Sequence, residues 1–319
     1  MKRIPEVNYN AGFNPIILKS LLRYIVQFFS KECPPAYFLT VTIMLAVPVY
    51  FNYTGHFDST HLFPEKGIGK FISYYLLFAS VYSGAFIIQK IIYTNAISYS
   101  NTSVSLILLA PAFFAFRLCF NWQDAWAKAN APAGFMQYYL QTTGWLARGL
   151  ILILPVYIFW RLTHKSREPF YCMKAIPSAR PYLILLALAI PIVAVSFTNK
   201  DILNYYPRVQ TLYRLPSANF LHYLFFELSY AFDFLSIELF FRGALVLALA
   251  SNLGTRCIVP MAAFYCCIHF GKPLPESISS YFGGILLGII AYHTKSIWGG
   301  LILHIGMAWL MELGGALLR

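Results

Sequence analysis

Apolar runs of near-spanning length recur along the chain, and they constrain its fold more than any other feature. A helix needs about 20 mostly apolar residues to cross the hydrocarbon core of a bilayer. Of the 319 residues, 59% are hydrophobic and only 11% are charged, whereas about a quarter of the residues of a soluble domain are charged. The sequence therefore predicts an all-α fold, a polytopic transmembrane helical bundle, although its length alone would allow two soluble domains.

The periodicity and length of the apolar runs indicate the individual spans. The candidate spans are 36–53, 71–93, 103–120, 136–160, 181–197, 219–250, 257–270, 277–294 and 296–316. The run 219–250 is too long for one straight crossing, so we expect a bent helix or two half-spans, and about eight or nine helices in all. The chain then divides into an N-terminal segment 1–35, a first group of spans in 36–218 and a core in 219–319.

The net charge of +12 comes from basic residues near the ends of apolar runs and in the loop 161–180. Such residues orient a membrane protein and contact anionic lipid, and no zinc-finger spacing or Arg-rich aromatic platform indicates nucleic-acid binding. The basic N-terminal segment predicts a cytoplasmic N-terminus. Compact loops and no recognisable address signal favour the bacterial inner membrane. Residues 14–31 form a basic amphipathic helix that either lies in the interface or packs under the bundle.

Ionisable side chains inside the apolar runs are the candidates for function. Glu238 and Arg242 are one helical turn apart, which places them on the same face of a helix with the carboxylate first. Two histidines, His269 and His304, follow in later apolar runs. A charge in lipid is costly, so such groups normally face a protein or water-filled interior and mark a functional site. We expect these four side chains to meet in one wet pocket.

Further acidic residues offer a weaker signal. Glu227 precedes Glu238 by three helical turns and shares its face if the helix is continuous, and Glu312 follows His304 by two turns. Both are supporting candidates, although Glu312 equally fits a position at the membrane surface. Asp233 lies on another face and is expected to pair with Arg117 or Arg148.

A metal site is the alternative use of the same side chains. Glu238, His269 and His304 offer three ligands and leave a fourth position for water, as in hydrolytic zinc sites. The chain has no HExxH motif, and its six cysteines include no CxxC pair.

Three motifs in the last hundred residues occur in a recognisable order. They are Ile237-Glu238-Leu239-Phe240-Phe241-Arg242, then Tyr265-Cys266-Cys267-Ile268-His269, and finally a glycine-rich run from Gly283 to Gly300 that leads to His304. The chain resembles the CPBP family of intramembrane endopeptidases, which includes type II CAAX prenyl proteases and bacteriocin-processing enzymes. The resemblance covers roughly residues 220–310.

The resemblance implies peptide-bond hydrolysis without a metal or other cofactor, on a membrane-associated protein or peptide. A Glu and His269 would activate water, and His304 with an Asn would stabilise the oxyanion. In this chain the family's first Glu position is Ile237 and its Asn position is Ala308. Glu238 or His269 would then activate water. The alternative is a related protein without catalysis, whose cavity binds a lipid, a peptide or a partner membrane protein.

Overall fold

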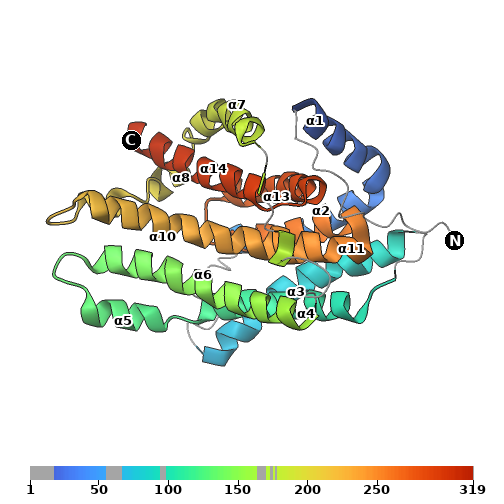
Figure 1. Cartoon of the computed structure of the whole chain (residues 1–319), viewed down its shortest axis with the longest axis horizontal. Helices are drawn as coiled ribbons and strands as arrows, with labels where there is room; N and C mark the ends of the chain where they lie inside the picture. The colour runs from blue at the N-terminus through green and yellow to red at the C-terminus, as the bar shows by residue number, and fades with distance from the viewer. Residues whose placement is uncertain are drawn as a thin grey trace.

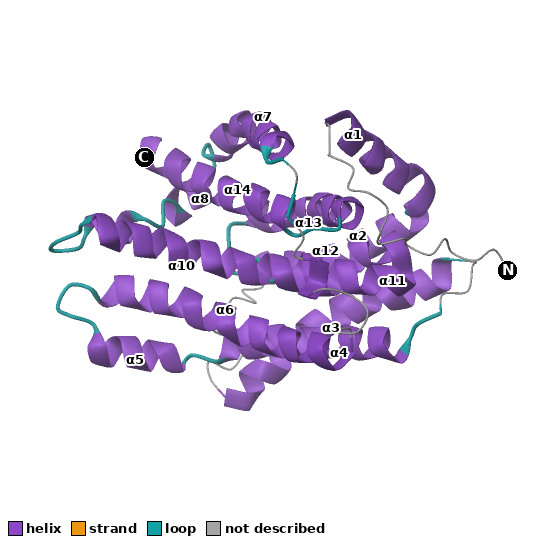
Figure 2. Cartoon of the chain, in the orientation of Figure 1, coloured by secondary structure: helices purple, strands orange, loops and turns teal. Residues whose placement is uncertain are grey.

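The regular elements of the computed structural model are helices (Figure 2). The structure describes residues 18–54, 67–93, 98–163, 170–172, 175–176 and 178–318. Much of the basic loop 161–180, and the first four residues of the amphipathic segment 14–31, lie outside the described residues. Within the described part, seven helical stretches are long and apolar enough to cross a membrane. The predicted polytopic helical bundle is confirmed.

The long helices follow the predicted spans to within a few residues. They are α2 (Pro35–Thr54), α3 (Gly67–Ile92), α4 (Asn101–Cys119), α6 (Met136–Thr163), α10 (Phe220–Glu238), α13 (Leu274–Thr294) and α14 (Trp298–Leu317), with the shorter apolar α7 (Arg180–Ser196). The sequence did not predict the short helices α5 (Trp122–Asn130), α8 (Lys200–Tyr205) and α9 (Gln210–Tyr213). These short helices connect the spans.

The long run that begins at α10 continues past the end of that helix. Asn219 caps its start in a capping box with His222. After Glu238 the chain continues as a π-helical stretch, η3 (Leu239–Ala248), and then as α11 (Leu249–Leu253). The run ends at Gly254, whose φ of +59° is accessible to glycine without strain. The short turn η4 (Gly254–Cys257) then reverses the chain into α12 (Ile258–Cys267).

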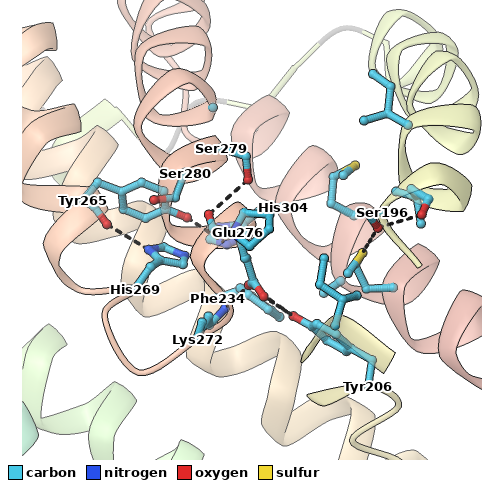
Figure 3. Close-up of a pocket in the computed structure, with 18 of the residues that line it drawn as sticks. Ser196, Tyr206, Phe234, Tyr265, His269, Lys272, Glu276, Ser279, Ser280 and His304 are labelled. Atoms are coloured by element: carbon cyan, nitrogen blue, oxygen red, sulfur yellow. Dashed lines mark hydrogen bonds and ion pairs between the residues drawn. The ribbon is translucent and has the colours of Figure 1, made fainter. Parts of the chain in front are cut away.

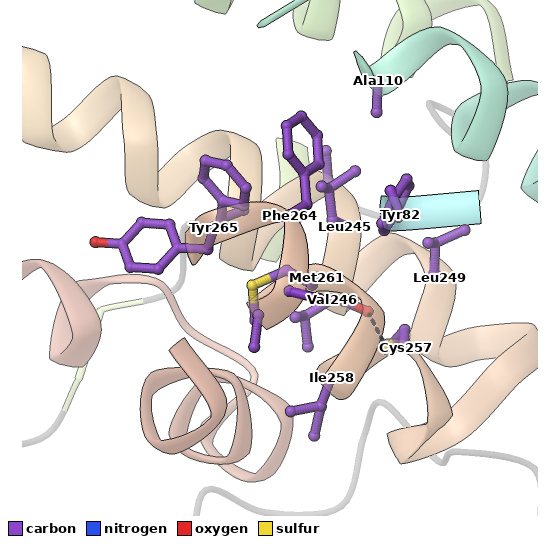
Figure 4. Packing of buried hydrophobic residues seen from close by; sticks show 14 of the residues in the cluster. Tyr82, Ala110, Leu245, Val246, Leu249, Cys257, Ile258, Met261, Phe264 and Tyr265 are labelled. Atoms are coloured by element: carbon purple, nitrogen blue, oxygen red, sulfur yellow. Dashed lines mark hydrogen bonds between the residues drawn. The ribbon is translucent and has the colours of Figure 1, made fainter. Parts of the chain in front are cut away.

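Helix α12 is the centre of the core and is buried along its whole length. Its side chains pack with η3, α3 and α4, as Figure 4 shows for Phe264, Leu245 and Tyr82. The glycines of α13 allow α12 to approach closely: a Cβ on Gly288 would lie 2.9 Å from the Met261 Cε atom. Small residues at helix contacts are the usual means of close packing in membrane proteins.

The outer helices, unlike this core, expose many of their large apolar side chains. In the apolar window of 220–267, 83% of the residues are buried, against 17% for α2 and 22% for α6. Large apolar side chains of the outer helices face outward, such as Ile43 (68% exposed) and Leu154 (61%). Lipid is the solvent that suits such a surface, so the chain is an integral membrane protein.

The N-terminal helix packs on the bundle. Helix α1 (Leu18–Gln27) continues into the short π-helical turn η1 (Phe28–Glu32). Leu21 of α1 is buried beside Leu287, and the Tyr24 ring stacks on His293 with centroids 3.8 Å apart. Figure 1 shows α1 lying across one edge of the long helices. This arrangement agrees with the second of the two alternatives for the segment.

Candidate functional site

Glu238 and Arg242 form a fully enclosed ion pair. Glu238 is the last residue of α10, and Arg242 lies one turn later in η3. Arg242 Nη1 is 2.9 Å from Glu238 Oε1, and both side chains are 0% exposed. The Arg242 guanidinium also lies over the Tyr265 ring, with Cζ 4.4 Å from its centroid. The π-helical stretch thus holds a charged pair within the protein, as such irregular turns often do at functional sites.

His304 extends this pair into a chain of polar groups. Its Nδ1 lies 2.9 Å from Glu238 Oε1, and its Nε2 lies 3.0 Å from the Tyr265 hydroxyl. A carboxylate only accepts hydrogen bonds, so in a neutral ring Nδ1 carries the proton and Tyr265 donates to Nε2. Gly300, one turn earlier on α14, has no side chain to interfere: a Cβ there would lie 2.5 Å from Glu238 Oε2.

His269 belongs to the turn between α12 and α13, outside the spanning helices. Its Nδ1 donates to the Tyr265 carbonyl oxygen at 2.8 Å, so Nε2 is the nitrogen left to accept a proton. Burial, and next the Lys272 ammonium, lower the pKa of His269 well below its usual range. Figure 3 shows His269 beside the Tyr265 backbone carbonyl and His304 beside the Tyr265 hydroxyl.

Two cavities adjoin at this point. The first, here called the apolar cavity, has a volume of about 380 Å³, and among its lining residues are Ile192, Val193, Ile202, Leu287, Met307, Ala308 and Met311. The second, here called the basic cavity, has a volume of about 310 Å³, and among its lining residues are Arg117, Arg148, Arg208, Asp233 and Ile237. Six residues line both cavities: Tyr230, Phe234, Tyr265, His269, Lys272 and His304.

The four predicted side chains come together, but only two of them line the cavities. His269 and His304 line both cavities, whereas Glu238 and Arg242 line neither. Glu238 reaches the cavity wall only through His304. Tyr265 was not predicted as a site residue. It occupies the aromatic position of its motif, four residues before His269. The signal that could have identified it is its hydroxyl, a polar group that a phenylalanine at this position would lack.

The supporting candidates lie elsewhere. Glu227 accepts a hydrogen bond from Trp309 Nε1 at 2.8 Å, and Glu312 accepts one from the Val209 backbone at 2.9 Å. Neither lines the apolar or the basic cavity. Both carboxylates thus join α14 to neighbouring segments. Among the described residues, no three His, Cys, Asp or Glu side chains are grouped so that they could hold a metal ion.

A family model described as type II CAAX prenyl endopeptidase Rce1-like matches residues 219–310. The resemblance to the CPBP family is confirmed. The match spans α10 to α14, and it therefore contains the whole Glu238–His304–Tyr265 chain and His269. No curated protein and no solved structure matches the chain.

Two further positions, Ile237 and Ala308, are those at which the CPBP family has a Glu and an Asn. Ile237, at the expected place of the first Glu, lines the basic cavity, and Ala308, at the expected place of the Asn, lines the apolar cavity. Each is 7% exposed. The two positions thus face the same space as His269 and His304, although their side chains carry no polar group.

Proposed function

We propose that this protein is an intramembrane endopeptidase of the CPBP type, which hydrolyses peptide bonds of membrane-associated substrates in or near the bilayer. The observation that carries the proposal is the orientation of His269. Its Nδ1 is held by the Tyr265 carbonyl, and its Nε2 is free to accept a proton at the wall of both cavities. A general base held in this way contributes roughly 10²–10⁴ in rate.

In the proposed reaction, His269 Nε2 takes a proton from water as the water oxygen bonds to the scissile carbonyl carbon. The carbonyl oxygen becomes an oxyanion. The same nitrogen then returns the proton to the leaving amine as the C–N bond breaks, which leaves a carboxylic acid and an amine. The reaction consumes one water and leaves the histidine neutral.

The oxyanion needs hydrogen-bond donors that are already in place. The Tyr265 hydroxyl lies on the wall shared by the two cavities, and its single proton is directed to His304 Nε2 at 3.0 Å. In the proposed reaction this proton turns from His304 Nε2 to the oxyanion as the oxyanion forms. Glu238 in turn fixes the His304 ring, and Arg242 holds the Glu238 carboxylate in place. Glu238, Arg242 and His304 are thus positioning residues, and His269 and Tyr265 face the reacting atoms.

One observation favours the second candidate, a CPBP homologue that binds without cleaving. Glu238 is fully buried and lines neither cavity, so it is not placed to activate water itself. The polar chain would then serve only to shape a binding cavity for a peptide, a lipid or a partner membrane protein.

A cleavage assay separates the two candidates. Wild type, His269→Ala and Glu238→Gln would be purified, reconstituted in liposomes and incubated with a library of membrane peptides. We expect His269→Ala to lower cleavage at least about 100-fold and Glu238→Gln to lower it less, because Glu238 acts through His304. His293→Ala, on the same helix bundle but lining neither cavity, should cleave like wild type. Equal product from wild type and His269→Ala would rule out the proposed base.

The pH profile gives a second readout. The lowered pKa of His269 keeps the ring neutral below the pH at which an ordinary histidine protonates. Cleavage should therefore persist as the pH falls from 7 to 6, and its acid limb should lie below about 6.5, the usual histidine pKa. An acid limb at 6.5 or above would contradict this assignment.

The proposal includes the side of the membrane. The basic residues of the N-terminal segment favour a cytoplasmic N-terminus. The test is thiol labelling of a cysteine-free variant that carries a single introduced cysteine in the N-terminal segment. We expect a membrane-impermeant reagent to label this cysteine from the cytoplasmic side of the membrane and not from the other side.

A further inference from the structure

The basic cavity carries more positive than negative charge. Four cationic side chains line it, from Arg117, Arg148, Arg208 and Lys272, against the single carboxylate of Asp233. Asp233 is already engaged, because its Oδ1 lies 2.7 Å from Arg117 Nη2. Walls of low dielectric focus the field of such a surplus into the cavity. The cavity therefore attracts an anion.

Two of these arginines have no ionic partner in the described part of the chain. Arg148 lies near the middle of the spanning helix α6, and no carboxylate of the described residues is within ion-pair distance of it or of Arg208. Arg208 lies over the Tyr205 ring, with Cζ 4.9 Å from the centroid, and the carboxylate that acts on it, Glu312, forms no ion pair with it and lines neither cavity. An arginine at membrane depth without a partner marks a binding site or an ion pathway.

Lys272 contributes less to the surplus, because Glu276 neutralises it. Its Nζ is 2.6 Å from Glu276 Oε1. Burial would lower the pKa of Lys272, but the Glu276 carboxylate and nearby tyrosines raise it well above its usual range. Lys272 thus stays charged and paired, and the demand for an anion rests on Arg148 and Arg208.

The neighbouring apolar cavity indicates what accompanies the anion. It adjoins the basic cavity through six shared residues, and its other lining side chains include Val193, Leu287 and Met311. A ligand that fills both cavities has a compact anionic group at one end and an apolar chain at the other. Within a membrane, a lipid with a phosphate headgroup has this chemistry.

We propose that the basic cavity binds the phosphate of an anionic lipid through Arg148 and Arg208, with an acyl chain of the lipid in the apolar cavity. Guanidinium groups suit phosphate because they donate two parallel hydrogen bonds. The bound lipid would lie along the wall formed by Tyr265, His269 and His304 and would exclude other ligands from it. This inference concerns binding alone and does not depend on the proposed peptidase activity.

The test is lipid binding by the full chain in a non-ionic detergent. The probe is fluorescently labelled phosphatidic acid, with unlabelled phosphatidic acid, phosphatidylcholine and inorganic phosphate as competitors. We expect phosphatidic acid to displace the probe at least tenfold more effectively than either of the others. The measurement reports binding and not cleavage, so a failure of the peptidase proposal leaves it intact.

Variants then locate the site. Arg148→Gln and Arg208→Gln should each weaken binding about tenfold or more. Arg148→Lys, which keeps the charge but loses the paired donors, should lie between wild type and Arg148→Gln. Arg161→Gln is the matched control, because Arg161 is an exposed residue at the end of the same helix α6 and lines neither cavity.

Three results would overturn the inference. Equal displacement by phosphatidylcholine would show that the headgroup charge is not recognised. Displacement by inorganic phosphate as effective as that by phosphatidic acid would make free phosphate, without a lipid chain, the ligand. Unchanged binding by folded Arg148→Gln and Arg208→Gln would place the lipid elsewhere on the protein.

Discussion

The same long helical run contributes to two ion pairs that differ in their surroundings. Asp233 pairs with Arg117 across to α4 at 2.7 Å, and Glu238 pairs with Arg242 along the run at 2.9 Å. The Asp233 side chain is 17% exposed and lines the basic cavity, whereas both members of the second pair are 0% exposed. A shift of five positions along the run, from Asp233 to Glu238, therefore leads from a pair open to the cavity to a pair closed to it.

The difference shows what each pair can do. The open pair has further partners, because Arg117 also donates to Ser236 Oγ and to the Arg148 carbonyl, and water in the cavity can replace any of them. The closed pair has no such substitute. Its carboxylate is committed to Arg242 and His304. The closed pair can therefore fix the orientation of the neighbouring His304 ring. The open pair can contact a ligand in the basic cavity.

The largest expected effect is the loss of Arg242. Arg242→Met leaves Glu238 buried without its cation, which typically costs about 3–5 kcal/mol of unfolding free energy. Equilibrium unfolding in detergent micelles would measure it. The double variant Glu238→Leu/Arg242→Met removes both charges and should be clearly less destabilised than Arg242→Met alone. A double variant as unstable as the single one would show that packing, and not the orphaned carboxylate, sets the cost.

The open pair should be less sensitive. Arg117→Met should cost about 1–3 kcal/mol, because Asp233 regains water from the basic cavity when its partner is removed. The same unfolding experiment gives the value, with Arg161→Gln as a surface control. Losses of equal size for Arg117→Met and Arg242→Met would end the distinction between the two pairs.

The hydrogen bond between Tyr265 and His304, at the end of the polar chain, should contribute less to the free energy of unfolding than either ion pair. Tyr265→Phe removes the donor to His304 Nε2 and keeps the ring beneath Arg242, so the expected cost is about 0.5–1.5 kcal/mol. Tyr82→Phe is the matched control, because the buried Tyr82 hydroxyl has no hydrogen-bond partner among the described residues. If both variants lose the same stability, the Tyr265–His304 hydrogen bond contributes nothing measurable.

Salt gives the finest test. The coupling energy of Arg117 with Asp233, from a double-mutant cycle, should fall by a few tenths of a kcal/mol when the salt concentration rises from about 0.05 to 1 M, because ions screen exposed charges over a few ångströms at high salt. The coupling of Arg242 with Glu238 should stay constant. A salt effect of equal size on both would indicate that solvent reaches the closed pair.

Much of this architecture follows from local sequence. The spans could be predicted because each depends on the length and period of one apolar run, and α4 and α13 lie within a few residues of the expected ranges. The Glu238–Arg242 pair could be predicted because one helical turn separates its members. The pairing of Asp233 with Arg117, one of two predicted partners, is confirmed.

The roles of the other site residues depended on distant segments. His304 meets Glu238 from 66 residues away, and Tyr265 meets His304 from 39 residues away. Sequence spacing carries no information about such contacts, so Tyr265 was overlooked, and Glu227 was assigned by helical face although it bonds Trp309. Arg148 and Arg208 acquired significance only when α6 and the segment after α8 were found on one cavity.

The sequence by itself determined that the chain is a membrane bundle and which ionisable groups have to be sheltered from lipid, because burial in hydrocarbon acts on each segment separately. Only the tertiary structure decided which of those groups face a cavity and which are enclosed. That outcome depends on how closely helices approach, as where Gly300 lets α14 reach Glu238, and close approach is a property of two segments together.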